Sequence, residues 1–194
     1  GTPDFAVPAL ESVARACDVV RVVTQPDRPG GRKLQLQPSP VKLTALAHRL
    51  PLAQPDRARD ESFIDELRKL NPDLIVVAAY GQILPENLLS IPKHGCINLH
   101  TSLLPKFRGA SPIQSAILNG ESESGVTIMQ MDAGLDTGPI LSQQSTPIRE
   151  DDDAATLHDR LAQIGAELLV RTIPDFISGR IKPQSQPVAG VSHT

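Results

Sequence analysis

An asparagine and a histidine lie two residues apart at the end of an apolar segment, in the run "CINLHTSLLP". Side chains at positions i and i+2 of a β-strand point to the same face, so Asn98 and His100 are predicted to share one. A histidine can carry a proton at neutral pH, and an amide can donate a hydrogen bond to a developing oxyanion. The spacing fits acyl transfer, and it equally fits two polar side chains that satisfy backbone groups at a strand end.

A carboxylate able to serve this pair lies in a glycine-containing loop, "AGLDTG". Asp136 in that loop could orient the imidazole and stabilise its protonated form. The segment "SLLP" does not have the G-x-S-x-G pattern of a serine nucleophile, so covalent catalysis through that elbow is not indicated. The chain also lacks the histidine and cysteine spacings of zinc sites, and no metal is expected.

Hydrophobic patterning predicts the elements that must position these residues. Strands are expected within residues 18–27, 74–84, 96–102, 125–132 and 138–148, and helices within 1–16, 40–50, 60–73, 109–121 and 151–179. Alternating strands and helices predict an α/β fold with a mostly parallel sheet covered on both faces. Sites in such sheets form at the carboxyl ends of the strands, where "YG", "NLHTS" and "MDAGLDTG" are all expected.

Composition limits the classes of function. The chain has 194 residues, 40% hydrophobic and 21% charged, which fits one globular domain. Its net charge of −3 gives the whole chain no electrostatic reason to coat nucleic acid, so any such contact needs a local basic patch. Two cysteines form no disulfide framework, which favours a reducing, cytosolic setting, and no apolar run approaches membrane-spanning length.

The loop "RPGGRK" is the one candidate for a basic patch. It carries Arg28, Arg32 and Lys33 on glycine-containing backbone. Such a loop is either a solvated surface feature or a mobile arm that contacts phosphate groups. The residues alone favour the solvated surface.

The segments "CINLHTSLLPKFRGASPIQ" and "GVTIMQMDAGLDTGPIL" together resemble the formyltransferase family that uses 10-formyltetrahydrofolate. The resemblance implies a Rossmann-like fold, formyl-group transfer without a metal, and a catalytic trio of Asn98, His100 and Asp136. It also implies a folate-lining segment, which comprises Ser102, Leu103, Leu104 and Pro105.

The segments "GTPDFA", "TQPDRPGGRK" and "PSPVK" narrow the resemblance to family members that formylate methionine on initiator tRNA for translation initiation. The loop that carries Arg28, Arg32 and Lys33 matches a loop that approaches the tRNA acceptor end in those members. The resemblance therefore reverses the preference for a solvated loop. It implies tRNA and folate as partners, no membrane, a monomer, and a place in the bacterial cytoplasm or an organellar matrix.

The family pattern also extends beyond this sequence at both ends. It has an apolar first strand directly before "GTPDF" and a β-rich domain after the region of the tail. We therefore expect residues 1–180 to be a catalytic domain whose first strand is missing, and residues 181–194 to be a linker toward an absent C-terminal domain.

Other functions stay open. A sister formyltransferase could act on glycinamide ribonucleotide or on an amino sugar nucleotide, because these enzymes share the N-x-H-x-S-L-L-P core. A hydrolase could release formate from the folate without an acceptor, and a non-catalytic scaffold would result if the pocket does not form.

Overall fold

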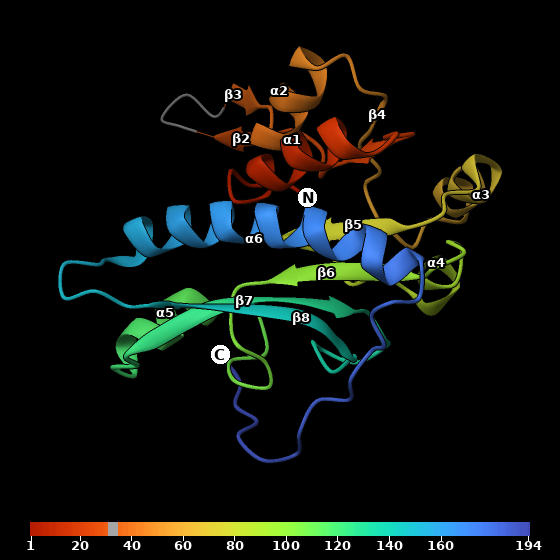
Figure 1. Ribbon diagram of the computed structural model, residues 1–194. Helices are drawn as coiled ribbons and strands as arrows, with labels where there is room; N and C mark the ends of the chain where they lie inside the picture. The colour runs from red at the N-terminus through yellow and green to blue at the C-terminus, as the bar shows by residue number, and fades with distance from the viewer. Residues whose placement is uncertain (31–34) are drawn as a thin grey trace.

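The computed structural model describes residues 1–30 and 35–194. It confirms the predicted α/β class (Figure 1). The elements in chain order are α1 (Ala6–Ala16), β1 (Val22–Val23), β2 (Arg28–Gly30), β3 (Gln35–Gln37), α2 (Pro40–Ala47), β4 (Leu52–Ala53), α3 (Glu61–Leu70), β5 (Ile75–Ala78), α4 (Glu86–Leu89), β6 (Cys96–His100), α5 (Pro112–Leu118), β7 (Glu123–Gln130), β8 (Ile140–Pro147) and α6 (Ala154–Ile177).

The largest sheet has the strand order β5-β6-β7-β8. Strands β5 and β6 are parallel, whereas β7 is antiparallel to both β6 and β8. The sheet is therefore mixed, and its parallel part lies on the β5 side. The connection between β7 and β8, residues 131–139, is shorter than the dozen or more residues that a parallel crossover requires, so this pair must run antiparallel.

Helix α6 packs over one face of this sheet, against β7 and β8, and α1 packs against α6 (Figure 1). Helix α6 begins at a capping box in which the Asp153 carboxylate accepts the backbone N–H of Thr156, and its buried stripe includes Leu157, Leu161 and Leu169. A Cβ atom built on Gly165 would lie 2.8 Å from the side chain of Leu99, so α6 passes directly against β6. This contact fixes the inner face of the strand that carries the candidate site.

A second core covers part of the opposite face of the sheet. Residues of α3 and α4 pack there around Tyr80 and Cys96. Burial raises the pKa of the Cys96 thiol to about 12, so this thiol stays protonated and acts as a core side chain. Asn98 and His100 follow Cys96 on the same face of β6, beyond this second core.

A cavity of about 410 Å³ lies between the short parallel pair β1–β4 and strand β5. Its walls are largely apolar and include Val22, Val23, Val76 and Val77. Among the described residues, β1 and β5 are not paired with each other. The two strands thus present facing edges across an apolar space.

Candidate active site

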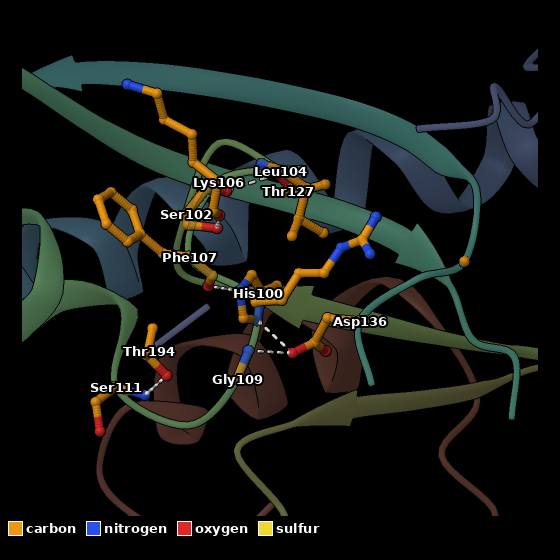
Figure 2. A network of polar contacts seen from close by, with 12 residues as sticks. His100, Ser102, Leu104, Lys106, Phe107, Gly109, Ser111, Thr127, Asp136 and Thr194 are labelled. Carbon is orange, nitrogen blue, oxygen red and sulfur yellow. Dashed lines mark hydrogen bonds and ion pairs between the residues drawn. The ribbon is translucent and has the colours of Figure 1, made fainter. Parts of the chain in front are cut away.

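His100 is the last residue of β6 and is buried, with 6% of its surface exposed. Its Nε2 lies 2.9 Å from the carbonyl oxygen of Phe107. A carbonyl can only accept, so Nε2 carries a hydrogen and donates it. The other ring nitrogen, Nδ1, lies 3.6 Å from Oδ2 of Asp136 (Figure 2). The ring is held at one nitrogen and faces a carboxylate with the other.

Asp136 reaches His100 from the opposite sheet edge to the one that the sequence predicts. We expected its loop at the same sheet edge as the end of β6, but β7 is antiparallel and Gln130 pairs with Ile97, near the start of β6. The loop 131–139 therefore has to reach back toward His100. Its carboxylate is held there by the backbone N–H of Gly109, which donates to Oδ2 at 2.9 Å.

Asn98 lies on the same strand face as His100, as the spacing predicts, and pairs in register with Val77 and Met129. Its side chain is half-buried, and it makes no hydrogen bond to any residue that the structure describes. The structure thus brings His100 and Asp136 into direct contact and places Asn98 two residues back along β6 with its amide uncommitted.

The turn after β6 is stabilised by hydrogen bonds to Thr127 of the neighbouring strand β7. The Thr127 hydroxyl donates to the Ser102 carbonyl at 2.6 Å and accepts the Leu104 N–H at 3.2 Å. The Ser102 hydroxyl donates to the Lys106 carbonyl at 2.6 Å, which closes the turn. The folate contact expected of Ser102, Leu103, Leu104 and Pro105 stays a prediction.

Two residues of the site were missed from the sequence. Phe107 supplies a backbone carbonyl to His100, and Gly109 supplies a backbone N–H to Asp136. Phe107 and Asp136 have φ angles of 55° and 51°, in the left-handed region that costs about 1–3 kcal/mol for a residue other than glycine. The only sequence signal is the glycine in "KFRG", because main-chain groups carry no residue identity.

The residue directly before the basic loop is held by side-chain hydrogen bonds. Arg28 opens β2, which pairs with β3, and the preceding Asp27 accepts hydrogen bonds from Lys42 and Gln54. The hydrogen bond from Lys42 is the main cause that lowers the pKa of the Asp27 carboxyl. Arg32 and Lys33, which were predicted as contacts of the same loop, lie outside the described residues.

Residues 1–30 and 35–194 also bear on metal and membrane sites. No group of three or more His, Cys, Asp or Glu side chains that could hold a metal ion is present there. No helix in these ranges is long and apolar enough to cross a membrane.

Known proteins share both the sequence and the fold. The chain is 56% identical to methionyl-tRNA formyltransferase of Xylella fastidiosa and 54% identical to that of Halorhodospira halophila, over 100% of this chain in each case. It spans only 63% and 62% of the length of these curated relatives.

Among solved structures, a sugar 3N-formyl transferase determined in the presence of dTDP and 5-N-formyl-THF has a TM-score of 0.72 and 26% identity. The match covers 100% of this chain and 67% of that chain. The family described as formyl transferase matches residues 6–173. That range includes the buried imidazole–carboxylate pair and the strand that carries it, and the chain belongs to the formyl transferase family.

Proposed function

We propose that the intact protein transfers the formyl group of 10-formyltetrahydrofolate to the α-amino group of methionine on initiator tRNA. The observation that carries this proposal is the buried pair of His100 and Asp136 at the end of β6, with the uncommitted Asn98 amide on the same strand face. The choice of methionyl-tRNA as the formyl acceptor is supported by relatives named methionyl-tRNA formyltransferase, at 54–56% identity.

The reaction is acyl transfer between two amines. The methionine nitrogen forms a bond to the formyl carbon, the carbonyl oxygen becomes an oxyanion, and the bond from carbon to N10 of the folate then breaks. One proton leaves the attacking amine and one reaches N10, so no oxidant or other reactant is consumed. Amide N–H groups that donate to the oxyanion supply much of the rate in such reactions.

The contacts of His100 assign its two nitrogens different tasks. Nε2–H is engaged with the Phe107 carbonyl and orients the ring. Nδ1 faces Asp136, so a proton gained from the attacking amine would sit on Nδ1 and be stabilised by the carboxylate. The Asn98 amide, uncommitted among the described residues, is the group left to donate to the oxyanion.

The substrates would meet the chain at two further segments. We propose that the turn Ser102–Pro105 lines the folate site and that the loop with Arg28, Arg32 and Lys33 approaches the tRNA. The anchoring of Asp27 by Lys42 and Gln54 supports the second assignment, because it fixes the base from which the loop extends.

For the whole protein we propose a catalytic domain at residues 1–180 and a linker at 181–194, acting as a monomer in the bacterial cytoplasm. The greater length of the curated relatives supports a longer protein. The apolar cavity between β1 and β5 has the facing strand edges that an added apolar strand would pair with.

A second candidate is transfer to an amino sugar nucleotide. It is favoured by the solved sugar 3N-formyl transferase, whose fold covers this whole chain. Its identity of 26% is about half that of the relatives named for methionyl-tRNA, so it ranks second.

The proposal is tested by formylation of charged initiator tRNA with Asn98→Ala and His100→Ala in the intact protein. Each variant is expected to lose about 100- to 1000-fold in kcat, because each removes a group that acts on the oxyanion or on the moving proton. Circular dichroism should show a retained fold. Near-normal formylation by either variant would refute the assigned roles.

A further inference from the structure

The segment after α6 returns to the candidate active site and bonds to its loops. Gln184 and Ile140 exchange two backbone hydrogen bonds at the start of β8, of 2.7 and 2.9 Å. Farther along, the Arg108 N–H donates to the Ser192 carbonyl at 2.9 Å, and the Thr194 N–H donates to the Arg108 carbonyl at 2.9 Å. Figure 1 shows this tail passing from α6 to the loop after β6.

Within this tail, the Gln186 side chain joins two loops of the site. Its Oε1 accepts hydrogen bonds from Nε and Nη2 of Arg108, at 3.1 and 2.7 Å. Its Nε2 donates to the backbone carbonyls of Asp136 and Gly138, both at 2.8 Å. Every donor and acceptor position of the amide is therefore used.

The two loops that Gln186 joins are those that hold the catalytic pair. Arg108 lies between Phe107, whose carbonyl fixes the His100 ring, and Gly109, whose N–H holds the Asp136 carboxylate. Asp136 is itself bonded to Gln186 through its carbonyl. Its left-handed backbone persists only where the surroundings hold it. The Gln186 side chain thus connects the segment that orients the His100 ring with the loop that carries Asp136.

We propose that Gln186 is a positioning residue that sets the distance between His100 and Asp136. It touches neither reacting group with its side chain and acts through the Arg108 segment and the Asp136 backbone. This inference rests on the proposed formyl transfer for its kinetic test, and on backbone geometry alone for its second test. It also gives the tail a role in the site in addition to that of a linker.

The kinetic test uses Gln186→Glu in the intact protein. The carboxylate still accepts from Arg108, but it replaces the donor N–H₂ with an oxygen that faces two carbonyls. We expect kcat to fall by roughly 10- to 100-fold, since a small displacement of a catalytic group has that effect. The KM for the folate donor should change less than about twofold, because transition-state geometry and not ground-state binding is lost.

The matched control is Gln184→Glu. Its side chain is exposed and only its backbone bonds to Ile140, so the same charge change occurs two residues away without touching the loops. Near-wild-type kcat is expected of it. If Gln186→Glu does not fold, Gln186→Met removes all four hydrogen bonds without adding charge. An unchanged kcat in the Gln186 variant, or an equal loss in the control, would overturn the proposal.

A second measurement separates this proposal from the function itself. Hydrogen exchange of the Gly109 amide, which donates to Asp136, should speed up about tenfold or more in Gln186→Glu and stay unchanged in Gln184→Glu. If the wild-type protein formylates nothing, the proposed function fails while this readout still tests the positioning. Unchanged exchange at Gly109 would overturn the positioning role.

Discussion

At the scale of single residues, the site depends on backbone groups as much as on side chains. The Phe107 carbonyl engages Nε2 of His100 and leaves Nδ1 facing Asp136, whose carboxylate is held by the Gly109 N–H. The side chains of His100 and Asp136 are 7% and 14% exposed, so their interaction is little screened by water. The two side chains should therefore act as one unit.

A double-mutant cycle tests this coupling. His100→Ala and Asp136→Asn are each expected to lower kcat/KM by roughly 100-fold or more, and the double variant should lose little beyond either single change. Asparagine keeps an oxygen for the Gly109 N–H, so Asp136→Asn removes charge with little change of shape. The cycle is measured by steady-state formylation. If the fold-losses in kcat/KM of the two single variants multiplied in the double variant, the residues would act independently. That result would contradict the coupling of His100 and Asp136.

Sequence reasoning could reach part of this site. The period of a β-strand places Asn98 and His100 on one face, where the spacing fits acyl transfer and equally fits two polar side chains that satisfy backbone groups. The glycine-containing loop indicates Asp136 as a carboxylate that could orient the imidazole, and the family resemblance adds it to the trio, although the argument from sheet edges is wrong about β7. Gln186 could not be found, because its contacts depend on how the chain returns after α6.

At the scale of elements, β7 supports the turn that follows β6. Thr127 in β7 is fully buried, and its hydroxyl also accepts from the Gln143 side chain of β8 at 2.9 Å. That side chain in turn donates to the Leu104 carbonyl at 2.9 Å. The antiparallel half of the sheet is thus tied by side-chain hydrogen bonds to the turn that presents the site.

Thr127→Val tests how much these hydrogen bonds contribute to the stability of the fold. The variant keeps shape and leaves the Ser102 carbonyl, the Leu104 N–H and the Gln143 amide short of a partner, which is expected to lower the free energy of unfolding by about 1–3 kcal/mol. Urea denaturation measures the change. Thr146→Val in β8 is the control, because Thr146 is a buried residue whose hydroxyl makes no hydrogen bond to the residues that the structure describes. Equal destabilisation of both variants would contradict the assigned support.

Strand and helix positions followed from patterning, but the direction of strands did not. Apolar runs at 74–84 and 96–102 gave β5 and β6, and the long stripe gave α6. Alternation of strands and helices led to a mostly parallel sheet, whereas β7 and β8 are antiparallel. Apolar patterning marks which residues are buried, and direction depends on the length and path of the connections.

At the scale of the whole molecule, the chain combines the buried pair of His100 and Asp136, a basic loop that begins at Arg28 and a tail that returns to the candidate site. The first lies within residues 6–173, which match the formyl transferase family. This chain spans 62–63% of the length of the curated relatives. The identity of the formyl acceptor is therefore a proposal about the longer protein. The basic loop that begins at Arg28 is the segment for which we propose a contact with tRNA.

Following the formyl carbon from donor to acceptor distinguishes the proposed acceptors. The intact protein is supplied with 10-formyltetrahydrofolate labelled in the formyl carbon and, in separate reactions, with charged initiator tRNA, glycinamide ribonucleotide or a dTDP-linked amino sugar. Label is expected on the methionine amino group, at a rate that His100→Ala lowers by about 100-fold or more. Label on either of the other amines, or formate released without any acceptor, would contradict it.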